Sequence, residues 1–181
     1  MARTTFGVQA IPIGDLNNNG VSELVVTLYI WGERPGFWES LTTLPERTLV
    51  MLVYLNLDGS VSQVVYLPEP LELQSLTNGT SLWGGSLGAV GDVNGDGRPD
   101  IAIGAPRCQT TRGPTGCIYI VSVGESAGEG NSVGLKYIRA TTNALTDALL
   151  PESRFAGSLV SINSTRGPLL LATFDRSRYV P

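Results

Sequence analysis

Apolar and β-branched residues occur along this chain in short stretches, each bounded by Gly, Pro, Asn or Asp. Such stretches predict β-strands, and the polar residues between them predict turns. The predicted strands fall into three groups: 8–13, 24–30, 48–56 and 62–67; then 86–91, 101–104, 116–123 and 134–140; then 158–163 and 169–174. We expect an all-β fold, in which only residues 144–150 suggest a helical turn.

Each group of strands begins with the same signature. An aromatic residue is followed by Gly or Ala, and a polar turn begins nine residues after the aromatic residue. The aromatic residues are Phe6, Trp83 and Phe155, and the turns begin at Asp15, Asp92 and Ser164. Repeated four-stranded units are typical of β-propeller blades. We therefore expect two full blades, at residues 1–76 and 77–150, and a partial third at 151–181.

The second turn carries oxygen-bearing side chains at its first, third, fifth and ninth positions. They belong to Asp92, Asn94, Asp96 and Asp100, and the carbonyl of Arg98 is available at the seventh position. Three carboxylates in one turn repel each other unless a hard cation with six to eight oxygen ligands lies between them. The spacing therefore predicts a Ca²⁺ site.

Two other structures share parts of this pattern. A hairpin turn rich in Asp and Asn can form without metal, since these side chains hydrogen-bond to their own backbone. An EF-hand loop shares the opening pattern but needs an acidic residue at position twelve, where this chain has Ile103. The carboxylate at position nine, directly before an apolar strand, indicates a loop within a β-hairpin.

The first turn repeats the pattern with fewer charges. Its candidate ligands are Asp15, Asn17, Asn19, the carbonyl of Val21, and Glu23. Two carboxylates replace three, so we expect weaker calcium binding here. The third turn, at residues 164–167, has no carboxylate, and we expect it to be metal-free.

The second unit resembles the FG-GAP repeat family, known from the propeller of integrin alpha subunits. Trp83-Gly84 stands for the Phe-Gly of the repeat, residues 92–100 for its calcium loop, and Gly104-Ala105-Pro106 for its Gly-Ala-Pro. The resemblance is weaker in the first unit and faint in the third. It implies that the loop joins the first two strands of a blade and that calcium stiffens it.

Two further features favour an extracellular location, either secreted or at the cell surface. Cys108 and Cys117 flank a loop between two predicted strands, and they form either a disulfide or two free thiols; the calcium motif favours the disulfide. Asn78 and Asn163 begin Asn-x-Ser/Thr sequences, which are acceptors for N-glycosylation.

Composition excludes several classes of function. The formal charge of −4 comes without a basic cluster, so we expect no nucleic-acid partner. No run of apolar residues is long enough for a transmembrane helix, so we expect no membrane insertion. The chain has no histidine, which removes the commonest general base, and neither cysteine has a plausible base nearby.

These features together predict a non-catalytic extracellular module with Ca²⁺ as its cofactor, used for adhesion or structural self-assembly. The alternative is an accessory propeller segment of a secreted enzyme, because FG-GAP repeats accompany the catalytic domains of some secreted phospholipases. Two blades and part of a third cannot close a ring, so the open ends predict a protein partner or self-association. Self-association gives a homo-oligomeric ring or a filament, unless the chain is a fragment of a longer propeller.

Overall fold

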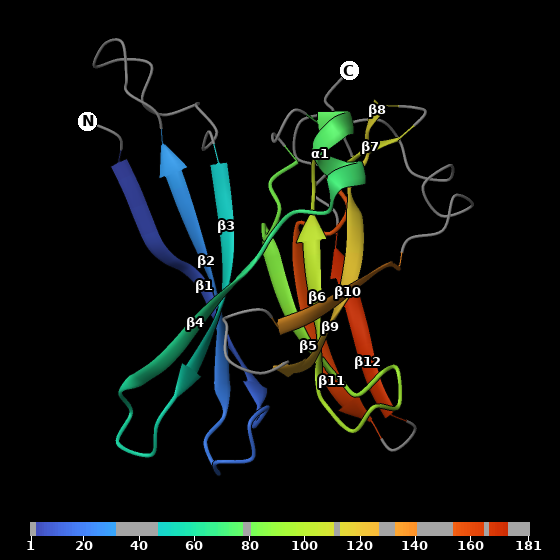
Figure 1. The fold of residues 1–181 in the computed structure, drawn as a ribbon. Coiled ribbons are helices and arrows are strands. Elements are labelled where there is room, and N and C mark those ends of the chain that lie inside the picture. Colours follow the sequence, from blue (N-terminus) through green and yellow to red (C-terminus); the bar gives the residue numbers. More distant parts are fainter. Residues whose placement is uncertain are drawn as a thin grey trace.

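A computed structural model of the chain describes residues 3–31, 47–77, 81–110, 113–126, 133–140, 154–164 and 167–173. These residues form three antiparallel sheets, one small hairpin and one short helix (Figure 1). The fold is therefore nearly all-β, as the sequence predicts.

Sheet 1 contains the first four strands in chain order. They are β1 (Arg3–Gly14), β2 (Glu23–Trp31), β3 (Arg47–Leu55) and β4 (Val61–Leu67). The β3–β4 hairpin turns at Asp58-Gly59, where Gly59 has a φ of 80° and the amide of Asn56 donates to the carbonyl of Ser60 at 2.8 Å. A positive φ of this kind suits glycine, so the Asp-Gly pair fixes the register of the hairpin.

Sheet 2 repeats this arrangement, and sheet 3 contains two strands. Sheet 2 has the order β5 (Ser86–Gly91), β6 (Asp100–Ala105), β9 (Cys117–Ser126) and β10 (Val133–Arg139). Between β6 and β9 lies the hairpin of β7 (Gln109–Thr110) and β8 (Gly113–Pro114). Sheet 3 pairs β11 (Ser158–Ser164) with β12 (Gly167–Thr173). All ten predicted strands are present, and the largest difference is at β1, which begins at residue 3 and not at residue 8 as predicted.

Sheet 2 lies between the other two sheets, because β5 contacts β1 on one side and β11 and β12 on the other. A large apolar core fills the space between sheets 1 and 2, with Leu52 and Ile103 among its fully buried members. A smaller core joins sheets 2 and 3 through Ala102, Ala156 and Leu159. Burial of these side chains supplies the main stabilisation of the stack.

The helix α1 (Leu71–Thr77) was not predicted, so the expectation that only residues 144–150 could be helical is wrong. The amides of Leu73 and Gln74 donate to the carbonyl of Pro70, which places a proline directly before the first turn. Leu73 is fully buried and anchors the helix on the core. Residues 144–150 themselves lie outside the described residues. Within those residues, no helix combines the length and apolar character needed to cross a membrane.

The second and third units begin with the same tight turn. In the second, Leu82 and Gly84 have φ values of 59° and 77°; in the third, Arg154 and Ala156 have values of 49° and 63°. In the second unit the Gly85 amide donates to the Leu82 carbonyl at 2.8 Å. In the third unit the Gly157 amide donates to the Arg154 carbonyl at 3.1 Å. The sequence repeat is therefore also a backbone repeat.

Each of these turns is docked on the preceding sheet. The Thr27 hydroxyl of sheet 1 donates to the Gly84 carbonyl at 2.9 Å, and the Ser86 hydroxyl of sheet 2 donates to the Ala156 carbonyl at 2.7 Å. The Trp83 indole N–H donates to the Leu67 carbonyl at 3.0 Å. These bonds satisfy polar groups that the packing of one sheet on the next would otherwise leave buried and unpaired.

The first unit departs from this pattern. Phe6-Gly7 lies within β1, where Phe6 pairs with Leu28 and a bulge follows. Phe6 is 67% exposed, whereas Trp83 is 1% and Phe155 8% exposed. Phe6 therefore does not share the buried position of Trp83 and Phe155.

Candidate metal-binding loops

Both acidic turns are loops that join the first two strands of a sheet, at the lower end of the sheets in Figure 1. Loop 15–22 connects β1 to β2, and loop 92–99 connects β5 to β6. The ninth residue of each pattern, Glu23 or Asp100, is the first residue of the strand that follows. The side chains at the first and ninth positions are therefore held by the two ends of one hairpin.

Asp92 organises the second loop through its backbone. Its Oδ1 accepts hydrogen bonds from the amides of Gly95 at 2.6 Å and Asp96 at 3.1 Å, and its Oδ2 accepts one from Gly97 at 2.8 Å. Gly95 and Gly97 have φ values of 80° and 84°, and a Cβ at either would meet no neighbour. Glycine is thus required here for backbone conformation and not for space.

Asn94 and Asp96 lie on the exposed side of the loop. Asn94 donates from Nδ2 to Oδ2 of Asp96 at 2.8 Å, and Oδ1 of Asp96 accepts from the Arg98 amide at 2.9 Å. The third and fifth positions of the pattern are therefore in direct hydrogen-bond contact.

Asp100 is the buried member of the second loop. Its side chain is 0% exposed, and Oδ2 accepts hydrogen bonds from the amides of Val93 at 2.8 Å and Asn94 at 3.3 Å. Its Oδ1 is also buried and has no hydrogen-bond partner among the described residues. An unsatisfied buried carboxylate oxygen is costly, and a bound cation would remove that cost.

The first loop has the same construction. Asp15 accepts from the amides of Asn19 at 3.1 Å and Gly20 at 2.8 Å, and Oε2 of Glu23 accepts from the Leu16 amide at 2.6 Å. Glu23 is 0% exposed, and among the described residues its Oε1 has no hydrogen-bond partner. Both loops therefore leave one oxygen of the ninth-position carboxylate buried and unpaired.

The remaining positions of the first loop face its backbone. Oδ1 of Asn17 accepts from the Asn19 amide at 3.0 Å, and Oδ1 of Asn19 accepts from the Val21 amide at 2.8 Å. Asn19 also donates from Nδ2 to the Leu55 carbonyl at 2.7 Å, which ties the loop to β3. The bond to β3 is made by the side-chain nitrogen of Asn19, whereas its side-chain oxygen contacts the loop backbone at Val21.

Burial raises the pKa of Glu23 above its ordinary value, and the Asp15 carboxylate adds a smaller upward contribution. The hydrogen bond from the Leu16 amide opposes both effects. The charged form of Glu23 is thus disfavoured by its surroundings when no cation is present.

In the parts of the chain that the structure describes, no three His, Cys, Asp or Glu side chains converge on one point. The carboxylates are held by backbone amides instead. Even so, the donor set of each loop suits calcium, which accepts amide and backbone carbonyl oxygens as well as carboxylates. In each loop, the buried carboxylate oxygen that lacks a partner among the described residues, in Asp100 or Glu23, is the atom that a bound cation would satisfy.

The two loops are neighbours in space. Gly14 precedes the first loop with a φ of 105°, and an added Cβ there would lie 3.2 Å from Cγ of Pro99 in the second loop. The amide of Gly14 also donates to the hydroxyl oxygen of Ser22 at 3.0 Å. Neither Ser22 nor Pro99 is among the predicted site residues, although both directly precede the ninth-position carboxylates.

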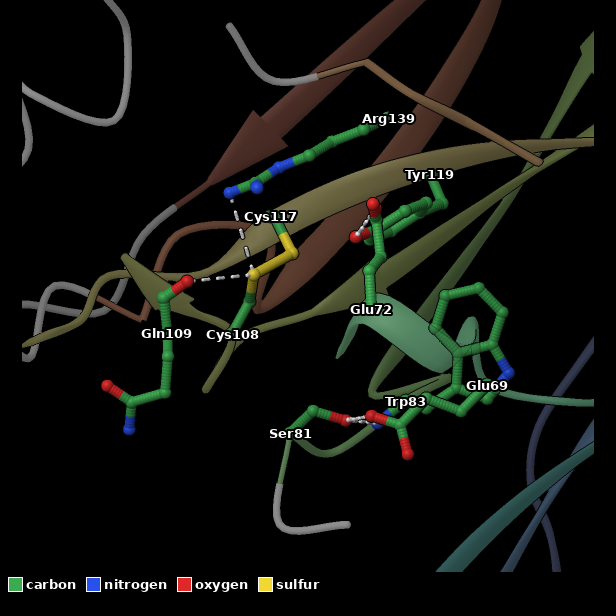
Figure 2. The surroundings of a disulfide bond; sticks show 9 residues. All are labelled: Glu69, Glu72, Ser81, Trp83, Cys108, Gln109, Cys117, Tyr119 and Arg139. Atoms are coloured by element: carbon green, nitrogen blue, oxygen red, sulfur yellow. Dashed lines mark hydrogen bonds between the residues drawn. A yellow bond between two sulfur atoms is a disulfide. The ribbon is translucent and has the colours of Figure 1, made fainter. Parts of the chain in front are cut away.

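The predicted disulfide between Cys108 and Cys117 is confirmed. Both residues are fully buried, their Cα atoms are 5.6 Å apart, and the bridge closes the loop that carries β7 and β8 (Figure 2). Arg139 lies beside the bridge and donates from its guanidinium to Sγ of Cys108 at 3.8 Å. Figure 2 also shows the Tyr119 hydroxyl, which donates to Glu72 of α1 at 2.7 Å.

Of the two candidate glycosylation sites, one lies among the described residues and the other does not. Asn78 lies outside the described residues. Asn163 lies in β11, one residue before its end, where its partner in the register is Pro168. The glycan at each site stays a prediction.

The second unit matches a known repeat family, and about half of the chain is similar to integrin alpha chains. Residues 84–116 match the FG-GAP repeat family. The chain is 34% identical to integrin alpha-7 of Mus musculus over 97 residues, which is 54% of this chain and 7% of that protein. It is 32% identical to integrin alpha-6 of Homo sapiens over 105 residues, which is 57% of this chain and 8% of that protein. The matches thus span less than a tenth of the length of these relatives.

Proposed function

We propose that this chain, which carries an FG-GAP repeat at residues 84–116, is a non-catalytic extracellular module of β-propeller type. Calcium binds two of its hairpin loops and stiffens them, and its sheet faces engage another protein or another copy of itself, in adhesion or structural assembly. Two full blades and the start of a third account for sheets 1, 2 and 3. The observation that carries the calcium proposal is the buried Oδ1 of Asp100, which accepts no hydrogen bond from any described residue.

The tighter site would be held by loop 92–100. Its ligands are the side-chain oxygens of Asp92, Asn94, Asp96 and Asp100 and the carbonyl of Arg98. Calcium supplies two positive charges that offset the repulsion between the three carboxylates. The hydrogen bonds that Asp92 already accepts shape the loop before the ion arrives, so little ordering is left for binding.

The weaker site would be held by loop 15–23. Its ligands are Asp15, Asn17, Asn19, the carbonyl of Val21, and Glu23. The two carboxylates provide less charge than the three in the other loop, so the affinity for calcium is lower.

Location outside the cell is supported by the buried disulfide and by the resemblance to integrin alpha chains. Glycans at Asn78 and Asn163 would be consistent with that location. Protein from the native source should then lose mass on treatment with a glycosidase that removes N-linked glycans.

A non-catalytic role is supported by the composition and by the use of the acidic residues. The chain has no histidine. The carboxylates of Asp15, Asp92 and Asp100 accept hydrogen bonds from loop amides, which suits them to a structural role. No observation in the described residues favours the alternative of an accessory segment of a secreted enzyme.

Calorimetric titration and thermal melting test the calcium proposal. With free calcium at about 100 times the dissociation constant, binding adds about 2.7 kcal/mol to the free energy of unfolding, which corresponds to about 5 to 10 °C in melting temperature for a chain of this size. Chelator should remove this shift, and Asp96→Ala should remove the part of it that the tighter site contributes. The control is Asp58→Ala, which removes an exposed carboxylate from the β3–β4 turn. A melting temperature that neither chelator nor Asp96→Ala changes would refute calcium binding.

A further inference from the structure

An Asn-Gly pair occupies the third and fourth positions of loop 92–100. Asn94 is exposed, and Gly95 follows it with a φ of 80°. Because glycine has no Cβ, the nitrogen of Gly95 is not screened from the side chain before it. That nitrogen can attack Cγ of Asn94 and close a five-membered ring, a reaction that is least hindered where glycine follows asparagine. The pair is therefore a candidate site of covalent modification.

Three hydrogen bonds within the loop hold the reacting groups. The Gly95 amide donates to Oδ1 of Asp92 at 2.6 Å, so a carboxylate lies within reach of the proton that the attacking nitrogen must lose. Oδ1 of Asn94 accepts from the Asp96 amide at 2.8 Å, which polarises the carbonyl under attack. Nδ2 of Asn94 donates to Oδ2 of Asp96 at 2.8 Å. All of these partners belong to the loop itself and none to a strand.

The first loop has the same position without the glycine. Asn17 is its third residue, and Oδ1 of Asn17 accepts from the amide two residues later at 3.0 Å, as in the second loop. The residue that follows is Asn18, which has a φ of 60° and carries a Cβ. A Cβ beside the attacking nitrogen hinders closure of the ring. Asn17 should therefore react slowly, although its part of the loop has the same hydrogen bond.

The first loop also contains the same dipeptide in a different setting. Asn19 is followed by Gly20, but the Asn19 side chain is half-buried and donates from Nδ2 to the carbonyl of Leu55 in β3 at 2.7 Å. To turn its Cγ towards the next nitrogen, Asn19 must break this bond to a strand of the sheet. Asn19-Gly20 should therefore be protected in the folded chain. The remaining Asn-Gly pair, at residues 78–79, lies outside the described residues.

We propose that Asn94 is a site of spontaneous deamidation in the calcium-free protein and that calcium bound to loop 92–100 suppresses the reaction. The Gly95 nitrogen attacks Cγ of Asn94. The proton that it loses passes by way of Asp92 to the side-chain nitrogen, which departs as ammonia. Water then opens the cyclic imide. Cleavage at Cγ leaves aspartate, and cleavage at the backbone carbonyl leaves isoaspartate, in which the main chain runs through Cβ and Cγ.

Calcium suppresses the reaction because it binds the same groups. As a ligand, Oδ1 of Asn94 is fixed towards the ion, so Cγ cannot turn to the Gly95 nitrogen. Asp92 then binds the ion with the oxygens that would take up the proton. The suppression rests on the calcium site of the proposed function, whereas the reaction of the calcium-free loop does not.

The two products change the calcium site in opposite ways. Aspartate at position 94 gives the loop a fourth carboxylate, and added ligand charge tightens calcium binding. Isoaspartate adds a carbon to the main chain between the first and fifth positions, which moves the ligands out of their spacing and should abolish the tighter site. A period without calcium thus leaves a lasting change in the loop.

Peptide mapping of the folded protein tests the proposal. The protein is incubated at neutral pH in calcium or in chelator, and fragmentation mass spectrometry follows the conversion of amide to acid at Asn94, Asn17 and Asn19. In chelator, Asn94 should convert fastest. With free calcium at about 100 times the dissociation constant, about 1% of the loops stay free, so conversion at Asn94 should slow about 100-fold.

Two results would overturn the proposal. Equal rates at Asn94 and Asn19 in chelator would show that the reaction proceeds through the unfolded chain, where the two Asn-Gly dipeptides are alike. Calcium that binds in calorimetry but leaves the rate at Asn94 unchanged would refute the suppression and keep the calcium site. A chain that binds no calcium but converts fastest at Asn94 would refute the calcium site and keep the modification.

Matched variants locate the protection. Asp100→Asn keeps an oxygen for the amides of Val93 and Asn94 but removes the tighter site, so calcium should no longer protect Asn94. Glu23→Gln changes the first loop, and calcium should still protect Asn94 there. Equal protection in both variants would contradict the assignment to loop 92–100. Asn94→Asp carries one of the two products, and it should bind calcium more tightly than the wild type in calorimetry; weaker binding would refute the stated effect of that product.

Discussion

The hydroxyl of Thr27 donates to the carbonyl of Gly84 at 2.9 Å and so joins sheet 1 to the first turn of the second unit. At this point the two sheets approach so closely that no side chain fits. A Cβ on Gly84 would lie 2.4 Å from Cγ2 of Val50. The glycine of the repeated signature is therefore required by the packing of one sheet against the next.

Gly84→Ala should destabilise the protein by more than about 2 kcal/mol, since it overpacks the contact and adds strain at a φ of 77°. The control is Gly59→Ala, because Gly59 has a φ of 80° with nothing within 4 Å of an added Cβ. There only backbone strain remains, about 1 kcal/mol. Urea unfolding of both variants measures the difference. Equal losses would show that conformation, and not packing, requires the glycine.

The sequence repeat alone does not show that glycine is required at position 84, because the third unit has Ala156 at the same place. It takes the place of Gly84 in the third unit with a φ of 63°, so a methyl group is tolerated in the same turn there. Whether a Cβ fits depends on the facing sheet, which sequence spacing does not reveal. The same limit applies to Phe6, whose signature matches Trp83 although its surroundings differ.

The strands were predictable because alternation and turn residues determine them locally. The helix α1 was not, because its seven residues give too short a pattern and its stability comes from the burial of Leu73. In the loops, the sequence identified the candidate ligands by spacing. It did not show that Asp100 and Glu23 are buried with one oxygen unpaired, since that depends on the strands packed around them.

Two tyrosines beside Trp83 should respond oppositely to removal of the hydroxyl. Tyr119 donates to Glu72 at 2.7 Å, whereas the buried hydroxyl of Tyr137 has no partner among the described residues. Tyr119→Phe should therefore cost about 1 kcal/mol, and Tyr137→Phe should be neutral or stabilising. Chemical unfolding at pH 7 measures both. A loss at Tyr137 as large as that at Tyr119 would contradict the assignment.

Alkaline pH should reveal the burial of Tyr137. Burial raises its pKa to about 12, above the ordinary value of 10 in the unfolded chain. The unfolded chain therefore loses the Tyr137 proton near pH 10 and the folded chain only near pH 12, so the free energy of unfolding falls as the pH rises between these values. Tyr137→Phe should flatten that part of the stability profile. An unchanged slope between pH 10 and 12 would show that Tyr137 does not titrate with unfolding.

Loss of the Cys108–Cys117 bridge should destabilise the fold by about 2 to 3 kcal/mol, because the bridge closes a short loop and restricts the unfolded chain. The paired variant Cys108→Ala/Cys117→Ala, compared with the oxidised wild type in urea, measures this. Reductant should destabilise the wild type and leave the paired variant unaffected. A response of the paired variant to reductant would point to an effect outside the bridge.

The two calcium sites should differ in affinity and be separable by single substitutions at the ninth position. Asp100→Asn and Glu23→Gln keep the size of the side chain and an oxygen that accepts the loop amides, so the local fold should persist. Each substitution removes the negative charge of a carboxylate that has one buried oxygen without a hydrogen-bond partner among the described residues.

Titration calorimetry of the wild type should show a tighter and a weaker calcium site. Asp100→Asn should remove the tighter one, because loop 92–100 has three carboxylates, and Glu23→Gln should remove the weaker one. Loss of the tighter site in Glu23→Gln would contradict this order and show that burial of the ninth carboxylate outweighs the number of charges.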